Sequence, residues 1–308
     1  MRLLPAVAAL MTVAGLSEPA VAKDPLVLEP SSRWEVDYAE DSCALRRQFG
    51  EGDQLTQLEM RRYQPGAQLE TTVASKVNMP RKSMNLALSE NFVRIRLGNE
   101  GEWIERYAMT AEFGDDFQGV IFQHSLSGAS PVLDDERKGW TGSHIETLAT
   151  LEATAGAGAD SLTVSGAFKD DVTLEAGPFK APLAALNSCI DDLLAHWGLD
   201  VAAHKTRARS AGPINLAGRF IVEPPAKRMG RWGPARVRLA ISETGEVTEC
   251  HVQLPPGESP SEEIACARIR DEFAFESALD NDGQPMKSYY IAKVGPVVTA
   301  VEVRYGAF

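Results

Sequence analysis

The sequence lacks the short motifs by which most enzyme and metal-binding families are recognised. It contains only four cysteines and five histidines, with no Cys-x-x-Cys pair and no two histidines at metal-ligand spacing. Gly-x-Ser-x-Gly, His-Glu-x-x-His and phosphate-binding loops are also missing. The aspartate pairs do not follow the spacing of a calcium loop. The sequence therefore predicts no metal, no cofactor and no catalytic residue.

The sequence also has fewer basic than acidic residues. Lys and Arg number 31 against 43 Asp and Glu, which gives a net charge of −12. Such an acidic surface repels phosphate backbones, so we expect no nucleic-acid partner. After residue 22, no uncharged apolar run approaches the about 20 residues that a membrane-spanning helix needs. The mature chain is therefore expected to have no transmembrane span.

The first 22 residues have the form of a secretory signal peptide. Arg2 is followed by an apolar, uncharged run over residues 3–16, and Ala20-Val21-Ala22 has the small-x-small form of a cleavage site. The run is too short for an uncleaved membrane anchor, which is the alternative interpretation. We expect cleavage after Ala22 and a periplasmic location for the mature protein.

In that compartment the four cysteines would be oxidised. Four cysteines permit three pairings. The simplest joins Cys43 to Cys189 and Cys250 to Cys266, which places one bridge in each half of the chain, whereas a crossed pairing would join the two halves.

Residues 23–200 are predicted to form a β-rich domain of sandwich or barrel-like form, closed by one helix. Residues 92–99 alternate with Val93 and Ile95 on one face, and residues 119–126 alternate in the same way. Residues 181–198 have helical apolar spacing, with Pro182 in the first turn and Gly198 at the end. Cys189 lies beside that apolar stripe, from which it can reach Cys43.

Residues 201–230 are predicted to be a basic linker that contains one short strand near Phe220. Residues 204–233 carry seven Lys or Arg and one acidic residue, Glu223. We interpret this stretch as lying against acidic domain faces. The alternative, contact with anionic lipid, is less favoured because the charges are spread out and lack interleaved aromatic residues.

Residues 231–308 are predicted to form a small antiparallel sheet packed by a helix. Residues 235–242 and 247–254 alternate like the two strands of a hairpin with a turn at Gly245. Residues 259–273 read as a helix with Ser259 as its cap. Cys250 points inward from the sheet and Cys266 points inward from the helix above it, so the two should meet and form a structural bridge.

The order of these features resembles the C-terminal domain of TonB-type energy transducers. Residues 231–304 share the alternating strand after Gly233, the Gly245-x-Val247 hairpin, the Pro-started helix with its cysteine, and Asp282-Gly283-Gln284-Pro285 before the last strand. The resemblance implies the fold and peptide binding at a sheet edge. The family's membrane anchor and Pro-rich spacer are absent, and residues 23–200 resemble no family.

From this resemblance we expect an envelope protein or an extended peptide to bind by strand addition to residues 286–294 or 297–305. The expected contact residues are Tyr289, Ile291, Val301 and Val303.

The rival hypothesis is an exported hydrolase with its active site in the N-terminal domain. His124 on an apolar strand face and His144 beside Ser143 are the candidates for such a site, although adjacent strand residues point to opposite faces. His196 and His204 flank a helix end, where basic residues complement the helix dipole. The sequence as a whole favours an exported two-domain binding protein of the cell envelope, in the α+β class.

Overall fold

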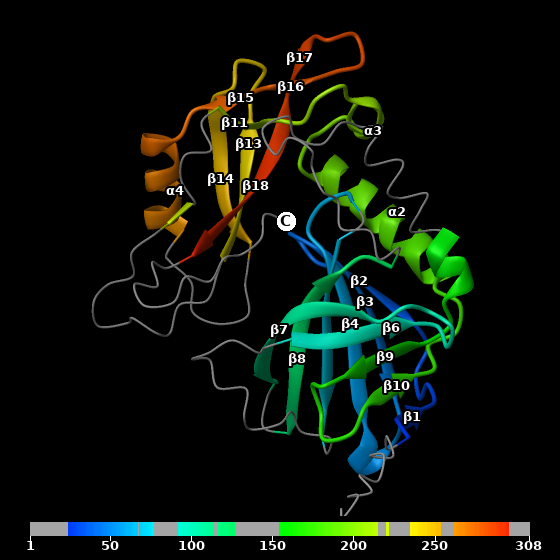
Figure 1. Ribbon diagram of the computed structural model, residues 1–308. Helices are drawn as coiled ribbons and strands as arrows, with labels where there is room; N and C mark the ends of the chain where they lie inside the picture. Colours follow the sequence, from blue (N-terminus) through cyan, green and yellow to red (C-terminus); the bar gives the residue numbers. More distant parts are fainter. Residues whose placement is uncertain are drawn as a thin grey trace, which may run out of the picture.

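The computed structural model describes residues 24–66, 68–76, 92–113, 116–126, 154–214, 220–221, 235–253 and 262–295. They form an α+β structure that is mostly sheet, which confirms the predicted class. Strands β1 to β10 gather in an N-terminal unit, and strands β11 to β18 gather beside helix α4 in a C-terminal unit (Figure 1). No helix among the described residues is long and apolar enough to cross a membrane.

The N-terminal unit contains one ten-stranded sheet. Its strands in chain order are β1 (Leu26–Leu28), β2 (Glu35–Tyr38), β3 (Cys43–Phe49), β4 (Thr56–Arg62), β5 (Leu69–Ser75), β6 (Phe92–Leu97), β7 (Ile104–Phe113), β8 (Phe117–His124), β9 (Leu162–Ser165) and β10 (Val172–Leu174). The order across the sheet is β1-β10-β9-β6-β7-β8-β5-β4-β3-β2. All neighbours are antiparallel except β1 and β10, which are parallel.

One chain segment supplies both end strands of this sheet. β1 and β2 follow each other in the sequence but stand at opposite ends of the strand order. Between them, Pro30 forms an isolated bridge with Phe49 at the end of β3. β7 changes its partner along its length: residues 104–107 pair with β6, and residues 108–113 pair with β8. The sheet is open in its strand order, yet the segment from β1 to β2 joins its two ends.

The alternating side chains of the strands face a common core. Val93 and Ile95 are fully buried, as the sequence predicts, and so are Val120 and Phe122. Gly119 stands where β8 crosses β5, and a Cβ at this position would lie 2.3 Å from the carbonyl oxygen of Val73. Only glycine therefore permits this approach of the two strands.

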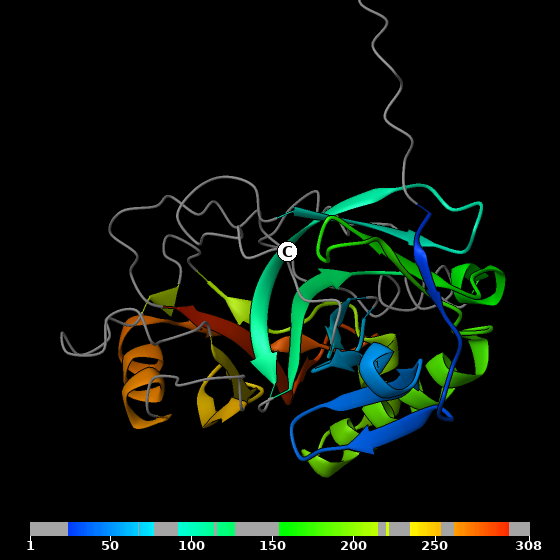
Figure 2. The same ribbon diagram turned by 90° about the horizontal axis from the view of Figure 1, so that it is seen from below.

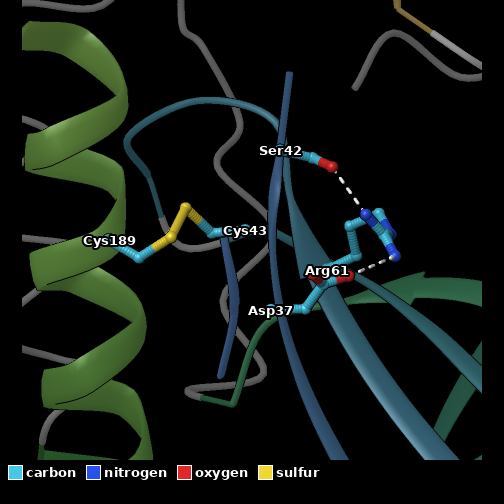
Figure 3. Close-up of a disulfide and its surroundings, with 5 residues drawn as sticks. All are labelled: Asp37, Ser42, Cys43, Arg61 and Cys189. Atoms are coloured by element: carbon cyan, nitrogen blue, oxygen red, sulfur yellow. Dashed lines mark hydrogen bonds and ion pairs between the residues drawn. A yellow bond between two sulfur atoms is a disulfide. The ribbon is translucent and has the colours of Figure 1, made fainter. Parts of the chain in front are cut away.

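Helix α2 (Lys180–His196) covers this core beside β2 and β3. Its apolar stripe is buried, as expected, and comprises Leu183, Leu186, Cys189, Ile190, Leu193 and Leu194. Cys189 forms a disulfide with Cys43, which ties the helix to the first residue of β3 (Figure 3). On the strand side, Arg61 donates a 2.5 Å hydrogen bond to the hydroxyl of Ser42, the residue before Cys43. The predicted pairing of Cys43 with Cys189 is confirmed.

The first part of the segment predicted to be a linker has regular structure. Residues 201–206 form helix α3 (Val201–Thr206), whose N-cap Asp200 accepts a hydrogen bond from the amide of Ala203. β11 (Gly212–Pro213) then pairs with β15 (Phe275–Glu276) of the C-terminal unit. The predicted strand near Phe220 is β12 (Phe220–Ile221). Residues 215–219 and 222–234 lie outside the described residues.

The C-terminal unit is built on a four-stranded sheet in the order β12-β18-β13-β14. Its longer strands are β13 (Ala235–Ile241), β14 (Val247–Gln253) and β18 (Ser288–Gly295), and a short pair is formed by β16 (Ala278–Leu279) and β17 (Pro285–Met286). Helix α4 (Glu262–Glu272) packs on the face that carries Val237, Leu239 and Ile241. The predicted helix start at Ser259 lies outside the described residues.

The second predicted disulfide, between Cys250 of β14 and Cys266 of α4, is also confirmed. Their Cα atoms are 5.7 Å apart, which lies within the range that a disulfide spans. Two disulfides and no free cysteine are compatible with folding in an oxidising compartment.

Candidate functional site

The two faces of the C-terminal sheet have different partners. One face packs on α4, and the other lies against the N-terminal unit, so the sheet stands between them (Figure 2). Because strand side chains alternate, the residues between the inward-facing ones on β13 point to this second face. Arg236 and Arg238 are among them, and both make contacts with residues of the N-terminal unit. This face and its surroundings form the candidate functional site.

Arg236 makes the closest charged contact between the units. Its Nη2 lies 2.5 Å from Oε2 of Glu70 on β5, and its guanidinium lies 4.0 Å from the ring centroid of Tyr63. The Arg236 and Glu70 side chains are only 15% and 14% exposed. The Tyr63 hydroxyl donates a 3.0 Å hydrogen bond to Oε1 of Glu70. Burial, and then the charge of Glu70, raise the pKa of Tyr63 above its ordinary value, so the phenol keeps its proton.

Asp41, in the turn between β2 and β3, receives three side chains from the C-terminal sheet. Nε2 of His251 lies 2.9 Å from Oδ2 of Asp41, and Nε2 of Gln253 donates a 3.0 Å hydrogen bond to the backbone carbonyl of Asp41. Nε of Arg238 lies 3.8 Å from Oδ1, which is an ion pair without a hydrogen bond. The Arg238 guanidinium also lies 4.6 Å from the ring centroid of Trp197.

The predicted binding residues Tyr289 and Ile291 lie on β18 and face the same junction. Tyr289 is buried, packs edge-on against Trp197 and stacks on His204, while Ile291 packs against the same apolar cluster. The structure therefore places both side chains in the contact between the units. Val301 and Val303, the other predicted binding residues, lie outside the described residues.

Trp197 and its neighbours also border a small polar cavity at this junction. The cavity has a volume of about 260 Å³ and is lined by Glu40, His196, Trp197, Gly198, Arg238 and Glu249. Glu40 and Glu249 are exposed, whereas only 14% of the Arg238 side chain is exposed. The cavity thus has an arginine and a tryptophan on its inner side and carboxylates near its opening.

The outer edge of β14 is the second accessible feature of this sheet. β14 pairs with β13 along one edge, and no described strand pairs with its other edge. Thr248 and Glu249 on this strand are exposed. β18 differs, because β12 pairs with Val294 and Gly295 at its end, and His204 of α3 contacts Ser288 at its start. An unpaired edge presents free N–H and C=O groups to a further strand.

The histidines considered for catalysis occupy different environments. His124 is 2% exposed, and its Nε2 lies 2.8 Å from the Thr71 hydroxyl. Burial lowers its pKa to about 4, so the ring is neutral and structural. His144 and Ser143 lie outside the described residues. No group of acidic, histidine and cysteine side chains that could hold a metal ion occurs in the described ranges.

His204 is also a structural residue. Its Nδ1 donates to the carbonyl of Asp200 at 2.8 Å, so its Nε2 accepts the hydroxyl hydrogen of Ser288 at 3.1 Å. Burial is the largest cause that lowers the pKa of His204, which agrees with a neutral ring. His196 lines the cavity instead.

The alternating patterns predict the inward faces of the strands, but they do not predict the residues that join the two units. Glu70, Tyr63 and Asp41 carry no motif, and their partners lie in a different part of the chain. Comparison with protein-family models, with curated proteins and with solved structures finds no match for this chain.

Proposed function

We propose that this chain is an exported periplasmic binding protein of the cell envelope, whose C-terminal sheet takes up an extended peptide segment at the outer edge of β14. The observation that carries the proposal is the position of β14 as the outermost strand with no described partner on its outer side. The signal-peptide pattern of residues 1–22 and the two disulfides support export. The resemblance of residues 231–304 to TonB C-terminal domains supports peptide binding.

The local structure of β14 suits this role. The disulfide from Cys250 to Cys266 fixes the strand to α4, so the edge is rigid before a peptide arrives. A rigid edge loses little conformational freedom on binding, which favours affinity. The register shift between Ala240 and Ile241 on β13, and the charge of Glu249, limit pairing with a second copy of the sheet.

The test uses extended peptides selected from a random display library on the full mature chain. Binding through the backbone should tolerate Thr248→Ala, because the threonine hydroxyl donates to the carbonyl of Ala240 on β13, on the side away from an added strand. It should not tolerate a proline whose missing N–H faces the peptide. Along residues 249–253, where the pairing with β13 is regular, successive N–H groups alternate between the two edges, so one of Glu249→Pro and Val252→Pro leaves the pairing with β13 intact.

Circular dichroism identifies which proline variant keeps the fold. That variant should bind the selected peptides at least about tenfold more weakly, since each lost backbone hydrogen bond weakens binding by about 1 kcal/mol and proline displaces its neighbours. Amide shifts mapped by NMR should concentrate on residues 247–253. A folded proline variant with wild-type affinity, or shifts confined to another strand, would show that the edge of β14 is not the site.

A further inference from the structure

Arg238 has hydrogen-bonding capacity that its described surroundings leave unused. Its Nε is buried and has no hydrogen-bond partner among the described residues. The nearest carboxylate, that of Asp41, stands 3.8 Å away, beyond hydrogen-bonding distance. An arginine has five N–H donors in a planar fork that matches a carboxylate, and buried donors are normally paired. Arg238 lines a cavity beside Trp197 and its side chain is 14% exposed, so the accessible part of this guanidinium points to a ligand with an acceptor group.

The charge around Arg238 restricts what that ligand can be. Glu40 and Glu249 line the same cavity, and Asp41 forms an ion pair with Arg238. Asp41 is already paired with Arg238 and contacted by His251, so the carboxylates that face a ligand are those of Glu40 and Glu249, and they disfavour a simple anion such as phosphate. A simple cation is also disfavoured, because the positive guanidinium of Arg238 would repel it. A ligand with one carboxylate and more than one positive group matches both sides of the cavity.

The dimensions of the cavity set the size of the ligand. Its volume of about 260 Å³ lies below the range of about 300–1,000 Å³ that is usual for drug-sized ligands. Gly198 borders the cavity with a positive φ of 71°, and a Cβ built on it would meet no atom within 4 Å. The absence of a side chain there leaves room beside Trp197. The space suits one amino acid.

We propose that this cavity binds an α-amino acid with a positively charged side chain. The carboxylate of the ligand is held by the guanidinium of Arg238, and its ammonium groups are directed toward Glu40 and Glu249. The ring of Trp197 positions Arg238 from behind. Residues of the N-terminal unit and of the C-terminal sheet both contribute, so the ligand bridges the two units. This site does not depend on strand addition at β14.

Calorimetric titration of the intact mature protein tests the proposal with four compounds. L-lysine and L-arginine should bind. 1,5-Diaminopentane keeps both amines of lysine but lacks the carboxylate, and L-glutamate reverses the charge of the side chain. Each should bind at least about tenfold more weakly than L-lysine, because each loses a charge-assisted interaction of about 1.5–3 kcal/mol.

Three variants connect binding to the cavity. Glu249→Gln and Glu40→Gln change exposed side chains and should each weaken L-lysine binding by about tenfold. Arg238→Gln should remove it. Glu246→Gln serves as the matched control, because Glu246 is exposed on the same hairpin but does not line the cavity. Circular dichroism and the masses of both disulfide-linked peptides confirm that each variant is folded.

Several results would overturn the proposal. Equal affinity for L-lysine and 1,5-diaminopentane would show that Arg238 holds no carboxylate. No heat with any compound, together with a direct hydrogen bond from Arg238 to Asp41 in a crystal structure, would show that Asp41 satisfies the arginine alone. Binding that is unchanged in both glutamine variants of the cavity would place the site elsewhere.

Discussion

Removal of Arg236 should separate the two units of the protein more than any surface charge substitution. Arg236→Ala deletes the ion pair with Glu70 and the contact with the Tyr63 ring at once. It also leaves Glu70, which is 14% exposed, without its positive partner. The variant therefore tests whether the junction between the units is held by specific contacts.

The expected loss follows from these contacts. Removal of one partner from a fully buried ion pair costs about 3–5 kcal/mol, and the residual exposure of both side chains lowers that value. The lost cation–π contact adds about 1 kcal/mol. We expect Arg236→Ala to reduce the free energy of unfolding by about 3 kcal/mol. Arg270→Ala changes an exposed arginine of α4 and should cost less than about 0.5 kcal/mol.

Urea unfolding of the oxidised protein provides the measurement. A double-mutant cycle with Glu70→Gln isolates the pair, because glutamine keeps an acceptor for the Tyr63 hydroxyl while it removes the charge. The coupling energy between Arg236 and Glu70 should be about 1–2 kcal/mol. Small-angle scattering on Arg236→Ala should show a larger radius of gyration at low urea. If the two substitutions prove additive and Arg236→Ala costs no more than the control, the docking of the units rests on other contacts.

Two further predictions concern stability. Replacement of Cys250 and Cys266 by serine should destabilise the C-terminal unit by about 3 kcal/mol, the loop-entropy value for cysteines 16 positions apart, measured as a shift of its urea midpoint. Because burial lowers the pKa of His124 to about 4, the unfolded chain binds a proton there before the folded chain does. Stability should therefore fall as the pH drops from about 6.5 to about 4. His124→Gln should flatten this slope in unfolding measured across that range, and an equally steep slope would assign it to other groups.

Features set by local periodicity were predicted well from the sequence. The helix expected over residues 181–198 is α2 at Lys180–His196, and its apolar stripe faces the core. The disulfide between Cys250 and Cys266 was predicted because alternation places Cys250 inward on a strand and helical spacing places Cys266 inward above it. Such patterns depend on residues close together in the chain, so they can be read without knowledge of the rest of the fold.

The partner of each face could not be predicted in the same way. Alternation places Arg236 and Arg238 on the face of the sheet opposite α4, but it does not show what covers that face. The covering residues, such as Glu70 and Trp197, belong to a different unit and share no pattern with β13. The linker was misleading for a related reason. Its charges were interpreted as lying against acidic domain faces, but Arg207 is 5% exposed and donates a hydrogen bond to the carbonyl of His204.

The path of the first strand has a consequence for how this chain folds. β1 is made first, yet its partner is β10, and the pairing of Leu26 with Val172 brings together distant parts of the chain. The bond between Cys43 and Cys189 joins residues 146 positions apart. Such non-local closures give a high contact order and slow folding, because the entropy of a long loop is lost before the contacts form. β1, the first strand in the sequence, can therefore pair only after β10 has been synthesised. A premature disulfide between Cys43 and either C-terminal cysteine would trap the chain before its sheet is complete.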